Sequence, residues 1–265
     1  MKKLITVLFA TILLVGCSGK PSSEKTIRVS CTPDPHCQIL EQAKPLLEKK
    51  GFDLKIVELT DYYIFNRSLN NKEVDANYFQ HLPFFNKEVD ANKYDLVNLG
   101  GIHIEPFGFY SQKIKDISEL KEGDNIIISN SVADQGRILS ILAKKGLIKV
   151  KDNFDPINGS IKDIVESKYN FKEIDPQLLV SAYENKEGAL VGINGNYAIS
   201  GGLKPNSAII LETADKSNPY VNIVATNKGL ENSEKVKALI EVLKSNDIKE
   251  YIKKTWGNGA VIPAE

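Results

Sequence analysis

The sequence predicts an α/β protein of two lobes, joined by two crossing strands, with a ligand cleft between the lobes. Three observations predict this fold class. Strand-like and helix-like segments alternate in two successive sets, two extended segments rich in aromatic residues separate these sets, and 265 residues suit about two domains. Pro106 lies within the first extended segment, which favours a passage between lobes because proline is disfavoured in a central strand.

The charge balance argues against a nucleic-acid-binding surface. Lys plus Arg and Asp plus Glu number 34 each, so no basic face is available to follow a phosphate backbone. Arginine is scarce, and Arg28, Arg67 and Arg137 are the only three in the chain. An arginine kept in such a lysine-rich chain is suited to hold a planar carboxylate or a fixed internal bond.

The N-terminus predicts an export signal and a lipid anchor. Residues 1–3 carry positive charge, residues 4–15 are apolar but too short to span a membrane as a stable helix, and small residues precede Cys17. The run LVGC that ends at Cys17 resembles the bacterial lipoprotein box, which implies a signal peptide over residues 1–16. Residues 17–25 would then be the lipidated cysteine and a polar, flexible tether. An ordinary signal peptide or an uncleaved anchor is the alternative.

The first strand-helix set falls within residues 26–107. Alternating β-branched residues predict its strands, apolar residues at helical spacing predict its helices, and Gly51 ends the first helix. The predicted strands are residues 26–32, 53–59 and 96–99, and the predicted helices are residues 36–50, 67–74 and 82–92. Residues 101–111 are extended and predict the first crossing between lobes.

The second set falls within residues 108–224, after which residues 225–265 return to the first lobe. The predicted strands are residues 125–129, 171–174, 189–193 and 208–211, and the predicted helices are residues 134–147, 176–183 and 195–201. Residues 219–226 are extended and predict the second crossing. Residues 233–255 predict one long amphipathic helix that closes the chain.

Two further cysteines, Cys31 and Cys37, allow three interpretations. They can form a disulfide, which persists outside the cytoplasm, or lie in the core as free thiols. With His36 and Asp34 they can also bind a metal, although a soft-metal site normally has four ligands at a clearer spacing. A disulfide requires their Cα atoms to lie within about 7 Å across a loop that holds two prolines.

Polar candidates stand where predicted strands end and helices begin, the place where open α/β sheets bind ligands. Arg137 at a predicted helix N-terminus can bind a carboxylate bidentately. Asn194 and Asn222 can each accept from an ammonium group and donate to a carboxylate through one amide. These groups suit a zwitterionic amino acid. The alternatives are a surface arginine at Arg137 and turn chemistry at Asn194, which precedes a glycine.

Aromatic residues near His81 predict the other end of the same site. Tyr62, Phe79 and His81 can line an apolar pocket with a hydrogen-bonding edge, although core aromatics and a structural histidine are the alternative. The parts of an enzyme are missing from the sequence. All three histidines precede residue 104, and neither a Gly-x-Ser-x-Gly motif nor a GxxxxGK[ST] phosphate loop is present.

Motifs along the whole mature chain resemble the NlpA-type lipoproteins, the methionine-binding subunits of methionine ABC importers. Their order and spacing carry the resemblance, rather than any single motif. They read TDY at residues 60–62, DANYFQH at 75–81, EPFG at 105–108, GR at 136–137, INGNYA at 193–198, PYVN at 219–222 and GAVIP at 259–263. The resemblance implies a periplasmic-binding-protein-like fold, whose lobes close around a ligand by hinge bending.

The resemblance also implies a ligand-binding set of eight residues. Three would hold the amino-acid end of the ligand, three would surround its side chain, and two are further candidates for contact. In that order they are Arg137, Asn194, Asn222, Tyr62, Phe79, His81, His103 and Glu105.

The function implied by the resemblance is solute capture for transport. The ligand would be L-methionine, D-methionine or a methionine-containing dipeptide, delivered to a membrane permease driven by an ATPase. The protein would act as a monomer held on the extracytoplasmic side of the membrane by its lipid anchor, without cofactor, metal or nucleic acid. Binding of another small apolar amino acid, or a surface adhesin or antigen that kept the fold, is the alternative.

Three departures from the family pattern lie near the expected cleft and bear on the choice of ligand. Residues 130–134 read NSVAD where the family usually carries an Asn-Asp-Pro-Thr-Asn-like loop. Phe65 replaces a usual proline, and the family's first loop usually lacks cysteines such as Cys31 and Cys37.

Overall fold

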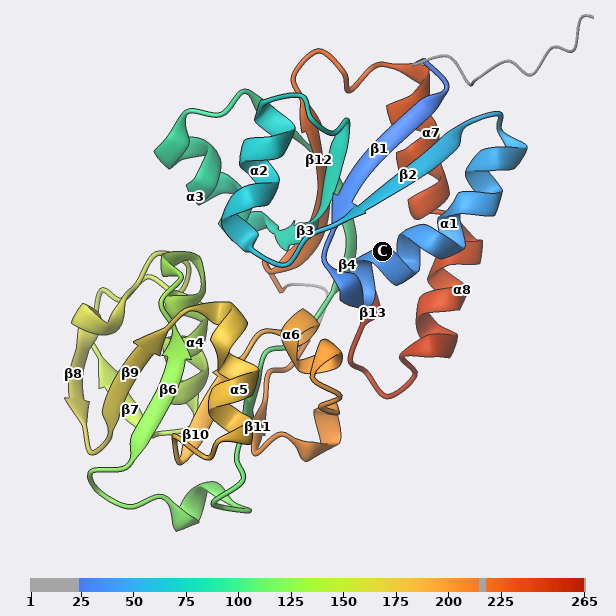
Figure 1. Ribbon diagram of the computed structural model, residues 1–265. Helices are drawn as coiled ribbons and strands as arrows, with labels where there is room; N and C mark the ends of the chain where they lie inside the picture. The colour runs from blue at the N-terminus through green and yellow to red at the C-terminus, as the bar shows by residue number, and fades with distance from the viewer. Residues whose placement is uncertain (1–23, 215–217, 265) are drawn as a thin grey trace, which may run out of the picture.

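The protein folds into two lobes, each built on a mixed β-sheet, as Figure 1 shows. This computed structural model describes residues 24–214 and 218–264, so the predicted signal peptide, Cys17 and most of the tether lie outside the described residues. The chain passes between the lobes after strand β4 and again before strand β12. The predicted fold class of two α/β lobes with two crossings is confirmed.

The first lobe contains a six-stranded sheet with the order β13-β4-β12-β3-β1-β2. Strands β1, β2 and β3 are parallel, whereas β12 is antiparallel to both of its neighbours. The sheet is therefore mixed, because the returning strand β12 inserts between β3 and β4. The strands are β1 (Thr26–Cys31), β2 (Asp53–Glu58), β3 (Ala76–His81), β4 (Leu96–Ile104), β12 (Val221–Asn227) and β13 (Ile262–Pro263).

Helices cover both faces of this sheet. Apolar side chains of α1 (Gln38–Lys49), α7 (Glu234–Leu243) and α8 (Asn246–Thr255) pack against one face. Those of α2 (Tyr62–Asn70) and α3 (Leu82–Asn92) pack against the other. None of the helices in the described part of the chain is long and apolar enough to cross a membrane.

The second lobe contains a five-stranded sheet with the order β11-β5-β10-β6-β9. Alternation along β6 sends Ile126 and Ile128 toward the core that α4 covers and Ile127 toward the core that α5 covers. The strands are β5 (Gly108–Tyr110), β6 (Asn125–Ser129), β9 (Asn170–Ile174), β10 (Leu190–Ile193) and β11 (Ile210–Leu211). The helices are α4 (Val132–Lys144), α5 (Leu179–Glu184) and α6 (Gly195–Ser200).

Short elements complete the two lobes. A hairpin that the sequence did not predict pairs β7 (Ile148–Val150) with β8 (Ile164–Ser167). Single helical turns are η1 (Pro33–Cys37), η2 (Ile117–Glu119), η3 (Ile161–Asp163), η4 (Pro176–Leu178) and η5 (Pro205–Ser207).

The predicted helix at residues 67–74 is misplaced, because only residues 67–70 of it are helical. Helix α2 begins earlier, at Tyr62, and ends at Asn70, and strand β3 follows where the sequence predicted neither a helix nor a strand. The polar residues in this strand interrupt the apolar pattern that would predict it, although all six of its residues are buried. Asn77 and Gln80 of β3 bond to the side chain of Asn66 on α2, so the buried amides satisfy one another.

The predicted single helix at residues 233–255 is also wrong, because the structure has two helices there. Helix α7 ends at Leu243, and Ser245 caps the start of α8 by accepting a hydrogen bond from the Ile248 N–H group. Ser245 and the polar residues that follow it favour a new helix start over continuation of α7.

Strand β12 belongs to the first sheet from its first residue. Val221 and Asn222 already pair with β4, so residues 221–224 lie with the first lobe rather than with residues 108–220. The expected boundary after residue 224 differs from this arrangement by four residues. The extended sequence pattern located the second crossing between the lobes, but the pairing of β12 with β4 determines the residue at which the crossing ends.

Cys31 and Cys37 form a disulfide, which decides between the three interpretations of these residues. Their Cα atoms lie 5.3 Å apart, and both side chains are buried at the carboxyl end of β1. The metal site with His36 and Asp34 is therefore wrong. The Asp34 carboxylate instead accepts a hydrogen bond from the Ser200 hydroxyl of the second lobe.

We expect the double variant Cys31→Ala/Cys37→Ala to unfold with a free energy about 2 kcal/mol lower than the parent, because the disulfide restricts a short loop in the unfolded chain. Urea denaturation followed by circular dichroism measures the difference. Equal denaturation midpoints for the two proteins, with no change in slope, would show that the bond contributes nothing to stability.

Candidate ligand-binding site

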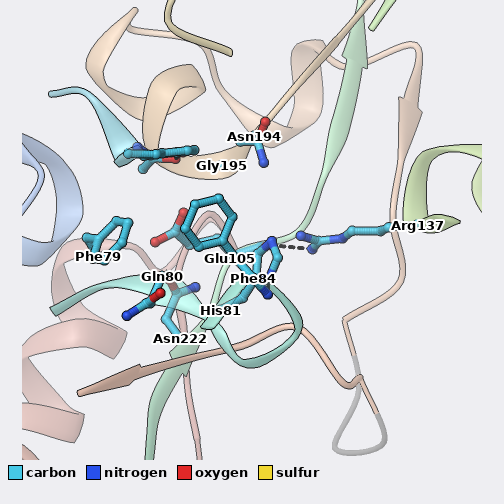
Figure 2. A pocket seen from close by; sticks show the side chains of 11 residues that line it. Phe79, Gln80, His81, Phe84, Glu105, Arg137, Asn194, Gly195 and Asn222 are labelled. Atoms are coloured by element: carbon cyan, nitrogen blue, oxygen red, sulfur yellow. Dashed lines mark hydrogen bonds between the residues drawn. The ribbon is translucent and has the colours of Figure 1, made fainter. Parts of the chain in front are cut away.

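A pocket lined by residues of both lobes lies between them (Figure 2). Seven of the eight predicted site residues line it. His103 does not, since it is fully buried behind the pocket wall. The lining residues are Tyr62, Phe79, Gln80, His81, Phe84, Glu105, Arg137, Asn194, Gly195, Asn196 and Asn222.

Strand ends place the polar groups of the pocket. His81 ends β3, Glu105 directly follows β4, and Asn194 directly follows β10. In the first sheet, Asn222 of β12 pairs with His81 on one side and His103 on the other. The two sheets thus present polar side chains to each other across the cleft, as open α/β sheets do at ligand sites.

An aromatic wall forms one side of the pocket. The ring of Tyr62 lies 5.9 Å from that of Phe79 and 5.8 Å from that of Phe84, in tilted and edge-on arrangements. Phe65, the residue that replaces the usual proline, stacks on Phe79 at 4.0 Å from outside the pocket. This wall can hold an apolar group of a ligand.

Asn194 carries an unsatisfied acceptor into the pocket. Its side-chain oxygen Oδ1 is buried and has no hydrogen-bond partner. Over the residues that the structure describes, only Ser30 Oγ shares this property, and Ser30 does not line the pocket. A buried acceptor without a donor is unfavourable by about 1–3 kcal/mol, so a ligand with an N–H group would stabilise this arrangement.

Arg137 is tied to an acidic partner that the sequence did not predict. Its Nε donates to Glu212 Oε1 at 3.0 Å, and its Nη2 donates to Glu212 Oε2 and to the Glu105 carbonyl at 2.8 Å. Its guanidinium also lies over the Tyr220 ring, 4.3 Å from the centroid. Burial opposes the charge, but Glu212 outweighs it and raises the pKa of Arg137. One edge of the guanidinium is thereby engaged before any ligand arrives.

His81 joins the two lobes through Asp134. The Phe84 N–H group donates to His81 Nδ1 at 3.1 Å, so the proton of a neutral imidazole lies on Nε2, which donates to Asp134 Oδ1 at 2.9 Å. Burial works to raise the pKa of Asp134, but the bond from His81 and the nearby charge of Arg137 hold that pKa below its usual value. Asp134 therefore stays ionised at the pocket edge.

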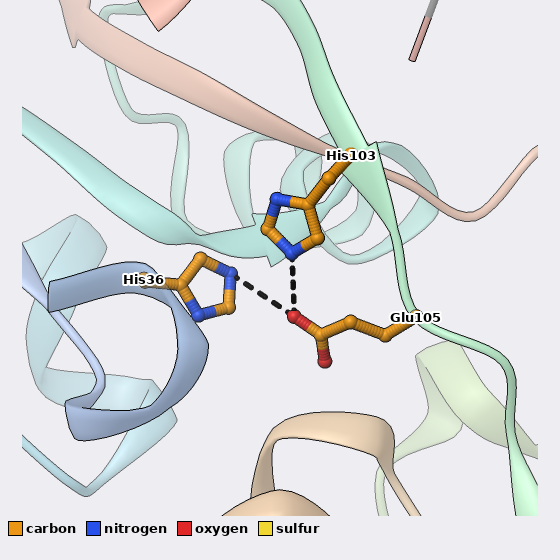
Figure 3. Close-up of side chains that lie close together, drawn as sticks. All are labelled: His36, His103 and Glu105. Atoms are coloured by element: carbon orange, nitrogen blue, oxygen red, sulfur yellow. Dashed lines mark hydrogen bonds and ion pairs between the residues drawn. The ribbon is translucent and has the colours of Figure 1, made fainter. Parts of the chain in front are cut away.

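Two buried imidazoles converge on one oxygen of Glu105, as Figure 3 shows. His103 Nε2 lies 2.7 Å and His36 Nε2 lies 3.5 Å from Glu105 Oε1. Burial lowers the pKa of His36 to about 4 and that of His103 to about 3, so both rings are neutral near pH 7. Burial also raises the pKa of Glu105. His103 Nδ1 bonds in turn to the Tyr78 hydroxyl.

This trio is the set of described residues grouped closely enough to hold a metal ion, with all its candidate ligand atoms within 4.8 Å of one another. The 2.7 Å contact between His103 and Glu105 is a hydrogen-bond distance. The arrangement is therefore that of a hydrogen-bonded cluster supporting a pocket carboxylate.

The charges around the pocket favour a cation. Arg137 and Glu212 form an ion pair, the ionised Asp134 lies beside the pocket, and no further arginine or lysine is among the lining residues. An ammonium group beside the Asn194 oxygen would reduce this imbalance. The amide of Asn222 and the remaining donors of Arg137 can bind a carboxylate at the same time.

Four lining residues escaped the sequence prediction: Gln80, Phe84, Gly195 and Asn196. Gln80 and Gly195 adjoin predicted residues along the chain, Asn196 follows Asn194 by two positions, and Phe84 follows His81 by three, so nearness in sequence was the available signal. Glu212 had no such signal, because it meets Arg137 across 75 positions of sequence.

Comparison with known proteins shows a close family relationship. The model of the NlpA lipoprotein family matches residues 27–265. The methionine-binding lipoprotein MetQ of Bacillus subtilis is 45% identical and covers 99% of each chain. The D-methionine-binding lipoprotein MetQ of Salmonella typhi is 33% identical over 97% of this chain and 95% of its own length. A nutrient-binding protein from Burkholderia cenocepacia, solved bound to methionine, superposes with a TM-score of 0.84 at 30% identity, covering 90% and 100% of the two chains.

We expect the buried state of His103 to make stability fall as the pH is lowered. In the unfolded chain this histidine takes up a proton near pH 6.5, whereas the folded chain does so only near pH 3. Unfolding therefore binds a proton between pH 7 and 5, which lowers the free energy of unfolding by about 2 kcal/mol over that interval. The variant His103→Gln lacks this contribution and should lose about 2 kcal/mol less.

Urea denaturation of the parent and His103→Gln at pH 7 and pH 5 measures the difference. The raised pKa of Glu105 acts in the opposite direction, but it is present in both proteins. Identical pH dependence of the two unfolding free energies would contradict a neutral, buried His103.

Proposed function

The chain belongs to the NlpA lipoprotein family, and on that premise we propose that it is an extracytoplasmic solute-binding lipoprotein that captures L-methionine for an ABC importer. The observation that carries the proposal is the unpaired, buried oxygen of Asn194 in a pocket with an aromatic wall. The names of its relatives, which include methionine-binding lipoproteins, support the same ligand.

An amino acid satisfies the pocket with both of its charged groups. Its ammonium group donates to Asn194 Oδ1 on the side of the pocket that also holds the Glu105 carboxylate. Its carboxylate accepts from the free donors of Arg137 and from the Asn222 amide. The thioether side chain packs on Tyr62 and Phe79, since sulfur and aromatic rings attract one another.

Ligand binding stabilises the closed arrangement of the lobes. Contacts across the cleft support this mechanism: Tyr62 donates from its hydroxyl to Asn196 Oδ1 at 2.5 Å, and Tyr197 donates to the Thr60 carbonyl at 2.8 Å. A ligand held by residues from both lobes binds the closed form more tightly than the open form and therefore shifts the population toward it. The closed protein is the form that docks on the permease.

A role in transport also implies an oligomeric state, a location and partners for the protein. The receptor acts as a monomer, is held at the cell membrane through lipid on Cys17, and delivers its ligand to a permease driven by a cytoplasmic ATPase. It binds the amino acid and does not transform it. D-methionine, a methionine-containing dipeptide or another small apolar amino acid would require the same amino-acid contacts and a different fit at the aromatic wall.

Native mass spectrometry of the chain from Ser18 onward, purified without added ligand, tests this proposal, followed by calorimetric titration of refolded protein with L-methionine. A retained mass equal to that of methionine supports the proposal. A different retained mass keeps the receptor function and changes the ligand, with residues 130–134 as the first segment to examine. An empty protein that gives no heat with any amino acid or short peptide favours the adhesin and contradicts transport.

We expect Asn194→Ala to weaken L-methionine binding by at least about tenfold, because the ligand ammonium loses a hydrogen bond to a charged group. Calorimetric titration measures the affinity. Asn185→Ala is the matched control, since Asn185 lies exposed in the same lobe and does not line the pocket. Equal affinities of Asn194→Ala and Asn185→Ala would remove Asn194 from the site.

A further inference from the structure

His36 lies outside the ligand pocket, yet it bonds to a side chain that lines it. The imidazole is fully buried, and its Nε2 lies 3.1 Å from the Oδ1 atom of Asn222. We propose that His36 is a positioning residue of the ligand site, which fixes the Asn222 amide with its NH₂ group toward the ligand and is itself held in place by the Cys31–Cys37 disulfide. The inference rests on the proposed function, because it explains how that site selects a carboxylate.

Glu105 decides which nitrogen of His36 carries the proton. Considered as a pair, the imidazole and the Asn222 amide allow two arrangements, with either partner donating. Glu105 Oε1 lies 3.5 Å from the same Nε2 atom, and Figure 3 shows His36 pointing at this oxygen. The oxygen of an ionised carboxylate accepts and does not donate, so with Glu105 ionised a proton on Nε2 is favoured and points toward two acceptors.

Thr32 completes the arrangement from the other side of the ring. Its Oγ1 atom lies 2.7 Å from His36 Nδ1. With the proton on Nε2, Nδ1 is an acceptor, and the Thr32 hydroxyl donates to it. Burial keeps the ring neutral, since it lowers the pKa of His36 to about 4, and one nitrogen therefore remains an acceptor at neutral pH.

The orientation of the Asn222 amide follows from these bonds. Its Oδ1 atom accepts from His36, which leaves the NH₂ group as the part of the amide available to a ligand. The backbone of Asn222 is fixed by its pairing with His81 and His103 in the sheet. Within one side-chain rotamer, the remaining freedom is rotation of the terminal amide, whose torsion is broad and nearly two-fold. His36 thus selects one of two otherwise similar orientations.

The disulfide fixes the segment that carries His36. Cys31 and Cys37 enclose both Thr32 and His36, and the Cys37 N–H group donates to the Thr32 carbonyl at 3.0 Å. The enclosed turn therefore holds the Thr32 hydroxyl within hydrogen-bond distance of the His36 imidazole. Opening the loop would let the ring move away from Asn222 and free the amide to rotate.

A positioned NH₂ group favours a ligand carboxylate over a carboxamide. The carboxylate accepts at both oxygens, whereas a carboxamide has one oxygen and an NH₂ group that meets the Asn222 donors unfavourably. A freely rotating Asn222 would accept from that NH₂ group instead. The ratio of affinities for L-methionine and L-methioninamide therefore reports the orientation of Asn222, which a general loss of stability would not change.

Calorimetric titration with both ligands tests the proposal. His36→Ala should weaken L-methionine binding about tenfold and leave L-methioninamide binding within about twofold, in line with the loss of one hydrogen bond. His36→Gln retains a side-chain N–H donor and should restore most of the ratio. Cys31→Ala/Cys37→Ala, like His36→Ala, should lower the ratio of the affinity for L-methionine to the affinity for L-methioninamide.

Ile39→Ala is the matched control for these variants. Ile39 is fully buried on α1, two positions after Cys37, and it does not line the pocket. This variant should unfold more easily while keeping the parent's ratio. Equal weakening of both ligands in His36→Ala, or failure of His36→Gln to restore the ratio, would overturn the positioning role.

Nitrogen-15 NMR of histidine-labelled parent protein gives a second readout that needs no ligand and no variant. The shifts of His36 should show the Nε2–H tautomer at neutral pH, and an Nδ1–H tautomer would overturn the proposal even if His36→Ala fails to fold. Failure of the parent to bind any amino acid, with the Nε2–H tautomer present, would contradict the proposed function and leave the His36 tautomer established.

Discussion

Pairing of buried polar groups is the constraint on which the structure between the lobes depends. Glu105 is held by His103 and lies near His36, and Arg137 is held by Glu212. Each of these groups would be unfavourable if buried alone, since an unpaired charge or amide loses its hydration without replacement. Asn194 Oδ1 is the acceptor that this pairing leaves open in the pocket, and a ligand ammonium would complete the set.

Partners for these groups come from both lobes, which connects ligand binding to closure. Asp134 of the second lobe meets His81 of the first, and Asn196 meets Tyr62. Separation of the lobes would replace these partners with water, and under the proposed function a ligand would add contacts that exist only in the closed form. The disulfide at Cys31 fits the same scheme, because it fixes a turn whose Asp34 accepts from Ser200 across the cleft.

The sequence predicted the lobes because apolar patterns mark strands and helices, and it located Glu105 and Asn194 because both follow the ends of such strands. It failed where polar side chains satisfy one another inside the fold. Strand β3 was missed because it contains the polar residues Asn77 and Gln80. Their side chains are buried through hydrogen bonds to Asn66 of helix α2, and no local sequence pattern reveals bonds between a strand and a helix. The ion pair of Arg137 with Glu212 depends on chain segments far apart in sequence, so only the folded arrangement shows that one edge of the arginine is already engaged.

A crystal structure of the refolded protein with L-methionine tests the central claim most directly. The account predicts ligand density in the pocket between the lobes, with the ammonium nitrogen within hydrogen-bond distance of Asn194 Oδ1 and the carboxylate at Arg137 and the Asn222 NH₂ group. A ligand bound elsewhere would contradict the account. So would a ligand in the pocket whose ammonium group leaves Asn194 Oδ1 without a partner.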